Sequence, residues 1–396
     1  MKILLVNKFY YRRGGDCVVV LNTEALLRDM GHEVAVFSMN YPDNLPCEQQ
    51  DYFASEVQFA GGIGAKVAAL RRTLGQGDVV AQFKRLLHDF APDVVHLHNI
   101  HSYISPVVAQ LAHEAGCRVV WTLHDYKLLC PSYACQRDGK PCELCFHDKS
   151  HVVRTRCMKG SLAASVIAWL EAKKWNRKVL ERYTHTFICP SQFMADKMRQ
   201  GGFDPAKLKV LCNFVDPEKL ARFEQTDTAQ RSDYYCYVGR LSEEKGVEAL
   251  LEAAAALPFK LMVAGGGPLE AELRQRYGDR PNITFLGMVD GERVATLLAG
   301  ARCSVMPSRC YDNNPLGVIE SLCSGTPVVG TPMGGIPELV AKDHGIVTAD
   351  CTPAAIAAAL HNAFERTWDY NAIKQESLKL FSPETHYQKL LNIYSS

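Results

Sequence analysis

Short apolar segments that are typical of β-strands alternate with helical segments along almost the whole chain. A first series of these segments covers residues 2–7, 32–38, 93–98, 118–123 and 184–190. A second series covers residues 208–213, 234–239, 259–265, 282–287, 302–307 and 326–330. Continuous apolar strands separated by helices indicate parallel sheets that are covered on both faces. The sequence therefore predicts an α/β fold with two doubly wound, Rossmann-like parallel-sheet domains.

The two series of strands also predict the limits of the domains. A chain of 396 residues is too long for one hydrophobic core, and residues 191–207 form a polar surface segment at the expected junction. We therefore expect an N-terminal domain over residues 1–190 and a C-terminal domain over residues 191–379. Residues 382–396 have the pattern of an amphipathic helix, which we expect to return to the N-terminal domain.

The composition argues against several classes of protein. A hydrophobic content of 47% and a charged content of 22% are ordinary for a globular protein, and a net charge of +1 gives no general affinity for nucleic acid. No apolar run approaches the roughly 20 residues of a membrane span. The amino terminus lacks the pattern of a signal peptide. Fifteen cysteines without an export signal favour a reducing compartment, so we expect a cytoplasmic protein.

Residues 306–327 form the most informative motif of the chain. Asp312 and Glu320 lie eight positions apart, on either side of the structure-breaking residues 313–317. We expect Asp312 on a loop and a helix from Val318 onward, with Glu320 in its first turn. Two acids and free backbone N–H groups at a helix start suit a ligand with hydroxyls and phosphate, such as a nucleotide sugar. A capped helix that binds nothing would also favour an acid in its first turn.

Glycine-rich and basic loops follow other strands of the second series. Gly239 and Arg240 end one strand, and Lys245 follows on the same loop. Arginine offers a fixed fork of donors and lysine a mobile charge, a combination suited to a diphosphate. The glycine run 265–267 after the next strand allows the backbone to approach a ligand closely. Because carboxyl ends of parallel strands meet at one edge of a sheet, we expect these loops to line one site.

Polar residues follow the strands of the first series as well. The pair Gly14-Gly15 begins a helix after the first strand, although the dinucleotide fingerprint G-x-G-x-x-G does not occur there. Histidines lie at or just beyond two neighbouring strand ends: His96, His98 and His101 at one, and His124 at the next. A single histidine at such a place is more often structural, but two adjacent strand ends favour a site.

The second half of the chain resembles the nucleotide-sugar-binding half of a glycosyltransferase of family 4, the retaining type with the GT-B fold. This resemblance rests on VGRLSEEKG, VAGGGPLEAEL, ITFLGMV, MPSRCYDNNPLGVIESLCSGTPVVGT and GGIPELV. The first half is similar through RRGGD, HLHN, TLHDY and ICPSQFM. The resemblance implies two domains that face a central cleft. It also implies transfer of a sugar from a UDP- or GDP-linked donor to a glycan or lipid-linked acceptor, as in the assembly of bacterial surface polysaccharide or lipopolysaccharide.

The resemblance also implies roles for individual residues. Arg240 and Lys245 would hold the donor diphosphate, Glu320 the ribose hydroxyls, and His124 would lie beside the anomeric centre. Asp312 stands where the family usually has a glutamate that contacts the donor sugar, so the carboxylate is retracted by one methylene. We expect catalytic roles for His124, Asp312, Arg240 and Lys245. The further donor-binding positions are Gly15, Gly239, Gly266, Asn314, Pro315, Leu316 and Gly317, of which the last four would place backbone N–H groups near the diphosphate and sugar.

The expected mechanism follows from charge. Departure of a nucleoside diphosphate leaves negative charge on oxygen, which Arg240, Lys245 and helix N-termini can stabilise without a catalytic metal ion. No side chain stands out as a nucleophile. Retention then favours attack from the face of the leaving group, with the departing phosphate accepting the proton of the acceptor hydroxyl.

Residues 130–157 hold five cysteines and two histidines. The pair Cys142-x2-Cys145 is typical of tetrahedral zinc sites, and Cys130 and Cys157 complete the set that we expect for a structural zinc ion. Alternative ligands are Cys135, His147 and His151. Reduced, buried thiols without a metal are the other interpretation.

Residues 161–184 have the pattern of one amphipathic helix. Its apolar side comprises Leu162, Val166, Trp169, Val179, Leu180 and Tyr183, and its basic side comprises Lys174, Lys178 and Arg182 together with Ile167 and Trp175. Basic residues interleaved with exposed Trp and Ile suit an anionic membrane surface, so we expect a peripheral position on the inner face of the cell membrane. An ordinary solvated face, with Trp175 covered by a loop, fits the pattern equally well.

Two other classes of function share parts of these patterns. An NAD(P)-dependent oxidoreductase would have the same layers, but residues 2–16 lack its glycine spacing. A non-catalytic protein that binds nucleotide sugars or lipid-linked glycans would keep the fold and lose the chemistry. The presence of Arg240, Lys245, Glu320 and His124 favours the enzyme.

Overall fold

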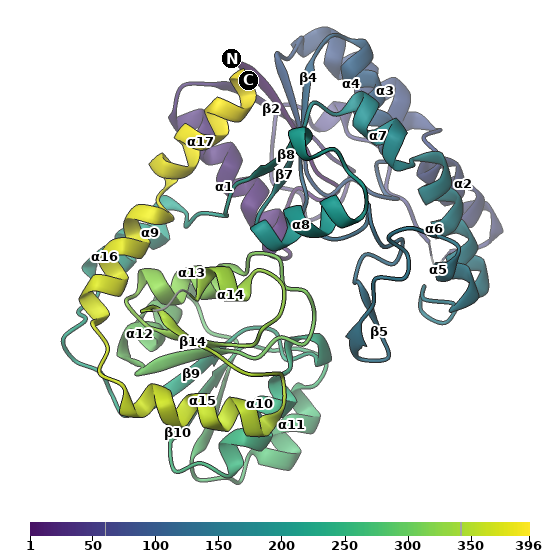
Figure 1. Cartoon of the computed structure of the whole chain (residues 1–396). Helices are drawn as coiled ribbons and strands as arrows, with labels where there is room; N and C mark the ends of the chain where they lie inside the picture. The colour runs from purple at the N-terminus through teal and green to yellow at the C-terminus, as the bar shows by residue number, and fades with distance from the viewer. Residues whose placement is uncertain (60, 341–342) are drawn as a thin grey trace. The chain divides into compact units, whose positions relative to one another are not determined.

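The computed structural model describes residues 1–59, 61–340 and 343–396, which form two compact units (Figure 1). The first unit comprises Met1–Arg137, Cys142–Leu211 and Tyr387–Ser396. The second comprises Asp138–Pro141 and Cys212–His386. Each unit contains one six-stranded parallel sheet flanked by helices. The predicted fold class, α/β with two doubly wound parallel-sheet domains, is confirmed.

The sheet of the first unit has the strand order β2-β1-β3-β4-β7-β8. Its strands are β1 (Lys2–Val6), β2 (Glu33–Phe37), β3 (Val94–Leu97), β4 (Arg118–Thr122), β7 (Thr186–Cys189) and β8 (Leu208–Val210). The helices of the unit are α1 (Gly15–Asp29), α2 (Ile63–Thr73), α3 (Asp78–Phe90), α4 (Val107–Glu114), α5 (His151–Arg154), α6 (Leu162–Lys174), α7 (Arg177–Tyr183), α8 (Gln192–Gln200) and α17 (Pro383–Ser395). Short 3-10 turns lie at Gln50–Tyr52 and Pro205–Lys207. The strand order reverses between β1 and β3, so the loops after these strands flank the usual position of a ligand crevice.

The sheet of the second unit has the strand order β11-β10-β9-β12-β13-β14. Its strands are β9 (Tyr234–Val238), β10 (Lys260–Ala264), β11 (Ile283–Gly287), β12 (Cys303–Met306), β13 (Val328–Gly330) and β14 (Gly345–Val347). The helices of the unit are α9 (Pro217–Gln225), α10 (Val247–Ala255), α11 (Glu270–Tyr277), α12 (Gly291–Gly300), α13 (Leu316–Cys323), α14 (Ile336–Leu339), α15 (Pro353–Glu365) and α16 (Tyr370–Leu380), with a 3-10 turn at Glu243–Lys245. Here the order reverses between β9 and β12. The loops after β9 and β12 therefore flank the crevice position of this sheet.

The boundary between the units differs from the one that the sequence predicts. We expected the junction at residues 190 and 191 and assigned 208–213 to the second series of strands. In the structure, β8 pairs in parallel with β7, and the first unit continues to Leu211. The sixth strand of the second sheet is instead β14, which the sequence analysis missed. Both are edge strands of three residues, and such short segments carry too little pattern to indicate which sheet they join.

The final helix α17 contributes apolar side chains to the core of the first unit. Leu390, Ile393 and Tyr394 are buried in one cluster with residues of the central strands, such as Ile3 and Leu5. The Arg118 side chain also donates a hydrogen bond from Nε to the Ile393 carbonyl oxygen at 3.2 Å. Burial of this apolar face, at about 25 cal/mol per Å², keeps the end of the chain on the first sheet.

Residues 161–184 form two helices rather than the single amphipathic helix that we expected. The helix α6 ends at Lys174, and α7 begins at Arg177, where the Asn176 side chain accepts a hydrogen bond from the Val179 N–H at 3.4 Å. Trp175 lies at this break. It is only 6% exposed, and its Nε1 donates to the Thr73 carbonyl oxygen at 3.0 Å. The expectation of an exposed Trp175 is therefore wrong, because the change of chain direction turns the indole inward.

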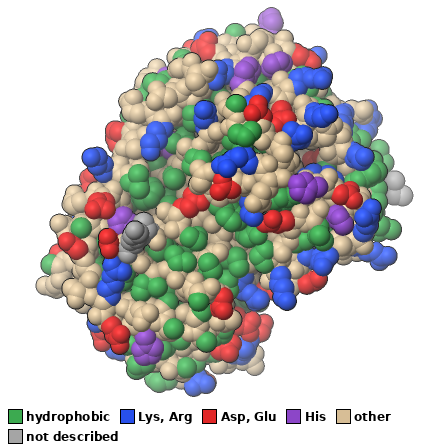
Figure 2. Space-filling model, viewed as in Figure 1, with side chains coloured by type: hydrophobic (Ala, Val, Ile, Leu, Met, Phe, Trp, Pro, Cys, Tyr) green, Lys and Arg blue, Asp and Glu red, His purple; other side chains and the backbone are tan. Residues whose placement is uncertain are grey.

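Charged side chains of both signs are interspersed on the visible face of the protein (Figure 2), in keeping with its net charge of +1. Within the described parts of the chain, no helix is both long enough and apolar enough to cross a membrane.

Candidate functional site

The loops after β9 and β12 meet at the point where the strand order of the second sheet reverses. The Lys245 Nζ lies 2.5 Å from the Asp312 Oδ2, and the Ser308 hydroxyl donates to the same oxygen at 2.8 Å. Burial lowers the pKa of Lys245, but the charge of Asp312 and the hydrogen bond to it outweigh that effect, so the pKa lies above its usual value. The structure thus places an ammonium group and a carboxylate, both largely shielded from solvent, at the expected ligand edge.

Glycines make the close approach of these loops possible. Gly246, directly after Lys245, has a φ of +67°, and a Cβ there would lie 1.9 Å from the Pro307 carbonyl oxygen. Gly334 has a φ of +63°, and a Cβ there would lie 2.1 Å from the Asp312 carbonyl oxygen. A side chain at either position would collide with backbone, so glycine fixes where Lys245 and Asp312 meet.

Arg240 lies on the loop after β9 with its side chain exposed. Among the described residues, this side chain has no hydrogen-bond or ion-pair partner. Its backbone is nevertheless fixed, because the Tyr237 hydroxyl donates to the Arg240 carbonyl oxygen at 2.7 Å. The neighbouring Gly239 donates its N–H to Ala264 at 3.0 Å, and Gly266 accepts from the Leu241 N–H at 3.0 Å. The guanidinium is therefore an exposed cation on a loop whose backbone is hydrogen-bonded to the end of β10 and the loop that follows it.

The helix α13 begins at Leu316, two residues earlier than predicted, so Glu320 lies in its second turn and not in its first. Pro315 has no N–H and cannot donate, which corrects one predicted donor. No side chain caps this helix, and within the described chain the N–H groups of Leu316 and Gly317 have no acceptor. Asn314 instead bonds to Asn213, accepting from its N–H at 2.9 Å. The start of α13 therefore offers two open backbone donors on the β12 side of the crevice position.

Glu320 forms an ion pair with Lys219 of α9, a residue that the sequence analysis did not single out. The carboxylate side chain is 13% exposed. Beside it lies a cavity of about 90 Å³, which is also lined by Val238, Gly291 and Val294. Because α9 is distant from α13 in sequence, only the tertiary structure identifies Lys219 as the partner that orients this carboxylate.

In the first unit, His124 contacts His98 at the carboxyl ends of β4 and β3. The His98 Nδ1 lies 3.0 Å from the His124 Nε2, and the two rings are stacked with centroids 5.3 Å apart. Dense burial lowers the pKa of His124 to about 4, a shift that Lys8 increases and Asp16 opposes. Burial also depresses the pKa of His98 strongly, with smaller contributions from His96 and His124. Both imidazoles are therefore neutral at pH 7.

The loop after β1 and the start of α1 place a carboxylate near His124. The Asn99 Nδ2 donates to the Asp16 Oδ2 at 2.8 Å. Burial raises the pKa of Asp16, but His124, Lys8 and the hydrogen bond from Asn99 together lower it further, so the carboxyl is ionised. Gly15 is the first residue of α1, and a Cβ there would meet no atom within 4 Å. Since the fold itself leaves this space open, Gly15 offers room for a ligand.

The cysteine-rich segment contains the short hairpin of β5 (Gln136–Arg137) and β6 (Lys140–Pro141) followed by α5. Hydrogen bonds from the Cys135 and Cys145 thiols lower the pKa of Cys130, so the Cys130 sulfur lies close to both of them. Cys142 and Cys157 are only partly buried. Over residues 1–59, 61–340 and 343–396, no three His, Cys, Asp or Glu side chains are arranged to hold a metal ion. The predicted zinc ligands therefore gain no support from the structure.

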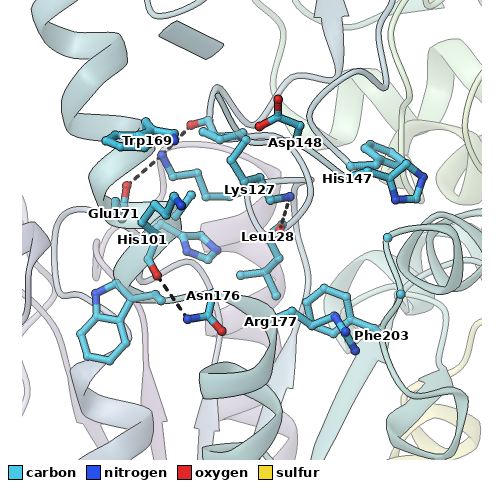
Figure 3. A pocket seen from close by; sticks show the side chains of 18 of the residues that line it. His101, Lys127, Leu128, His147, Asp148, Trp169, Glu171, Asn176, Arg177 and Phe203 are labelled. Carbon is cyan, nitrogen blue, oxygen red and sulfur yellow. Dashed lines mark hydrogen bonds and ion pairs between the residues drawn. The ribbon is translucent and has the colours of Figure 1, made fainter. Parts of the chain in front are cut away.

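A cavity of about 470 Å³ lies between this segment, α6 and the loop after α8 (Figure 3). His101 and His147 line it, and His101 is stacked on Trp121 with its pKa strongly lowered by burial. The Lys127 Nζ lies 3.0 Å from the Glu171 Oε2 within the wall of the cavity. His101 is thus separate from the His98–His124 pair, although the three histidines belong to neighbouring strand ends.

The two units define a class of protein with the architecture known as GT-B. Over its whole length the chain is similar to the sucrose-phosphate synthase (tll1590) from Thermosynechococcus elongatus, with a TM-score of 0.68, 16% identity and coverage of 98% of that chain. It is equally similar over its full length to Anabaena Alr3699/HepE in complex with UDP and glucose, with a TM-score of 0.67, 19% identity and coverage of 100% of that chain. These likenesses establish the fold.

The family follows from the sequence. Residues 232–366 match the family described as "Glycosyl transferases group 1", and residues 13–219 match the family described as "Glycosyltransferase Family 4". Because the second match spans more than half of the chain, the protein belongs to this glycosyltransferase family. The alternative of an NAD(P)-dependent oxidoreductase receives no support.

Individual relatives of known sequence share about a quarter to a third of their residues with the chain over the matched parts. An uncharacterized 42.6 kDa protein in the cps region of Klebsiella pneumoniae is 25% identical over 86% of this chain and 87% of its own length. A GDP-mannose-dependent alpha-(1-6)-phosphatidylinositol dimannoside mannosyltransferase of Mycobacterium tuberculosis is 31% identical over 46% of this chain and 49% of its own length. An uncharacterized glycosyltransferase, MJ1607, of Methanocaldococcus jannaschii is 27% identical over 48% of this chain and 54% of its own length. The chain thus spans about half the length of two of these three curated relatives.

Proposed function

We propose that the protein is a retaining hexosyltransferase that moves a sugar from a nucleotide sugar to a saccharide or lipid-linked acceptor. The observation that carries this proposal is the meeting of Lys245 with Asp312 at the reversal point of the second sheet. Arg240 on the same loop as Lys245, and the open N–H groups of Leu316 and Gly317, add further positive potential there. Such a combination suits a diphosphate joined to a hydroxyl-bearing sugar.

Lys245 and Arg240 are the proposed stabilisers of the leaving diphosphate. In the structure described here, Asp312 holds the Lys245 ammonium in place, so the cation needs little reorganisation when negative charge develops on the phosphate oxygens. The free oxygen of Asp312 is then available to a sugar hydroxyl. Because these cations supply positive charge themselves, we propose that transfer requires no added divalent metal.

Glu320 is the proposed partner of the ribose hydroxyls, with Lys219 holding its carboxylate in one orientation. The ribose does not change during the reaction, so this contact contributes to binding of the donor rather than to turnover.

His124 is the proposed contact to hydroxyl or phosphate oxygens of the donor sugar. Its depressed pKa makes it a neutral hydrogen-bonding group and not a general base near pH 7. The proton of the attacking acceptor hydroxyl then passes to an oxygen of the departing diphosphate. The bond from the anomeric carbon to that phosphate breaks on the same face on which the new glycosidic bond forms.

The setting of the reaction is also part of the proposal. The relative in the Klebsiella pneumoniae cps region and the mycobacterial mannosyltransferase support a role in surface-glycan assembly, with a lipid-linked acceptor. HepE, solved with UDP and glucose, and the GDP-mannose-dependent relative support UDP or GDP as the nucleotide. Exposed Leu162 and Leu170 on α6, together with Lys173 and Lys174 in the last turn of that helix, suit peripheral contact with an anionic membrane from the cytoplasmic side.

A panel of nucleotide sugars tests the proposed function. The purified protein should release nucleoside diphosphate slowly from one UDP- or GDP-sugar by hydrolysis, and Lys245→Ala should slow this release about a hundredfold. Tight binding of one nucleotide sugar with no hydrolysis, and no transfer to lipid-linked saccharide extracts, would favour a non-catalytic binding protein instead.

The predicted structural zinc is a separate proposal with its own measurement. Metal analysis of protein purified without chelator should give about one zinc per chain if cysteines of residues 130–157 bind it. Less than a tenth of an equivalent, with thermal stability unchanged by chelator, would leave reduced thiols as the correct interpretation.

A further inference from the structure

His98 is a buried histidine of which only one ring nitrogen has a hydrogen-bond partner. Its Nδ1 lies 3.0 Å from the His124 Nε2, whereas its Nε2 is buried and has no hydrogen-bond partner. His96 cannot serve as that partner, because its own nitrogens already contact the Tyr394 and Thr122 hydroxyls, each at 2.7 Å. The backbone of His98 is fixed as well, since its carbonyl oxygen accepts from the Trp121 Nε1 at 2.8 Å.

The unpartnered Nε2 decides which ring donates the hydrogen bond between His98 and His124. If His124 were the donor, a neutral His98 would carry its own proton on Nε2, as a buried N–H without an acceptor. If His98 donates from Nδ1, its Nε2 is only an unused lone pair. An orphaned buried N–H is rarer and more costly than an under-used acceptor, so the second arrangement is favoured. The low pKa values of both rings support it, because neither is protonated on both nitrogens at neutral pH.

We infer that His98 is a positioning residue that fixes His124 as the tautomer with its proton on Nδ1. The Nδ1 of His124 has no hydrogen-bond partner among the residues that the structure describes, and the residue is partly exposed. His124 therefore presents a neutral N–H donor at this strand end. Its complement is an acceptor oxygen, either a sugar hydroxyl or a phosphate oxygen.

The charged and titratable groups around the pair are consistent with this assignment. Asp16 at the start of α1 and Lys8 after β1 act on His124, with opposite signs. His96 is the further titratable group that acts on His98, with ring centroids 4.2 Å apart. None of these side chains offers an acceptor to the His98 Nε2.

Nuclear magnetic resonance tests the inference without any assay of activity. In protein labelled with 15N-histidine, long-range 1H–15N spectra distinguish the two neutral tautomers and the charged ring, and His124→Gln identifies the His124 signals. The expected result is the Nδ1–H tautomer of His124, unchanged between pH 6 and pH 8. A proton on Nε2, or a charged ring at pH 7, would overturn the inference.

Two substitutions of His98 then test its role as a positioning residue, a step that rests on the proposed function. His98→Asn keeps an amide donor near the place of Nδ1, and His98→Leu removes it. We expect His98→Leu to lower kcat for donor hydrolysis roughly tenfold or more, and His98→Asn to restore most of that loss. Equal loss in both folded variants, with the His124 tautomer unchanged, would assign His98 a merely structural role. If His98→Leu does not fold, the His98→Asn rate and the wild-type spectrum decide. Absence of turnover in the wild type would refute the proposed function and leave the tautomer result standing.

Discussion

The residues at the strand ends of the two units differ in their charge state. In the second unit, Lys245 and Asp312 form an ion pair that is largely shielded from solvent, and the exposed Arg240 lies on the same loop as Lys245. In the first unit, His98 and His124 are neutral imidazoles that share one hydrogen bond. The second unit thus keeps charged side chains available, whereas burial in the first unit keeps the two imidazoles neutral. The contrast fits a reaction in which charge develops on a diphosphate while a sugar is held by neutral donors.

The sharpest test of this comparison removes a cation from the second unit. Lys245→Ala or Arg240→Ala should lower kcat about a hundredfold, or ~3 kcal/mol, by analogy with the loss of a donor to a developing oxyanion. Steady-state kinetics with saturating donor measures the effect, because it appears in turnover rather than in donor binding. Arg276→Ala is the control, since that exposed arginine of α11 pairs only with surface carboxylates such as Glu248 of α10 among the ion pairs of the described residues. Full activity of either variant, or loss of activity in EDTA that only magnesium or manganese restores, would contradict the assignment.

Removal of Glu320, the proposed partner of the ribose hydroxyls, should have a smaller effect, and the effect should be on nucleotide binding. Glu320→Ala is expected to weaken nucleoside diphosphate binding about tenfold, as the loss of one charge-assisted hydrogen bond would. Calorimetric titration with UDP and with GDP measures the change. Lys219→Ala leaves the carboxylate in place and should weaken binding less. An unchanged Kd in Glu320→Ala would remove this residue from the nucleotide site.

The neutral state of His124 predicts how stability depends on pH. Its folded pKa of about 4 lies below the ordinary value of 6.5, so the unfolded chain binds more protons between these values. The stabilising contribution is therefore complete above about pH 6.5 and is lost as the pH falls toward 4. Urea denaturation across this window should show a free energy of unfolding that decreases with falling pH, less steeply in His124→Gln. An identical slope in the variant would mean that His124 is charged or solvated in the native state.

The smallest effect is expected from the residue that departs from the family pattern. Asp312→Glu keeps the charge that holds Lys245 but extends the carboxylate by one methylene. We expect a shift in preference among donor sugars with little change in nucleoside diphosphate affinity. Rates with a panel of sugars on one nucleotide measure it. A large loss of nucleotide affinity would show that the distance from Lys245 to Asp312 matters more than the charge.

Most of the fold could be predicted from local pattern. Continuous apolar segments such as 93–98 and 302–307 mark buried parallel strands, because only such strands are covered on both faces. Short edge strands escaped this reasoning, as β14 and the placement of β8 show. The break at Trp175 was not predicted either, because the amphipathic pattern continues through the change of chain direction. The Asn176 side chain caps the start of α7 at this break.

The residues of the candidate site also fall into those that the sequence predicted and those that it did not. Motif spacing predicted site roles for Arg240, Lys245, Asp312 and Glu320, because the segments that carry them contain glycine and charge at strand ends. It did not identify Lys219 as the partner of Glu320, nor Ser308 as a donor to Asp312.

The sequence by itself determined the class of fold, the family and the strand ends at which we propose the chemistry, since these depend on periodicity and on residues close together in the chain. Only the tertiary structure decided the protonation of those residues. Burial keeps His98 and His124 neutral. The ion pair of Lys245 with Asp312 and the orientation of Glu320 depend on partners up to 101 positions away in the chain. Electrostatic interactions depend on distance and on solvent exclusion, and neither quantity is written in local sequence.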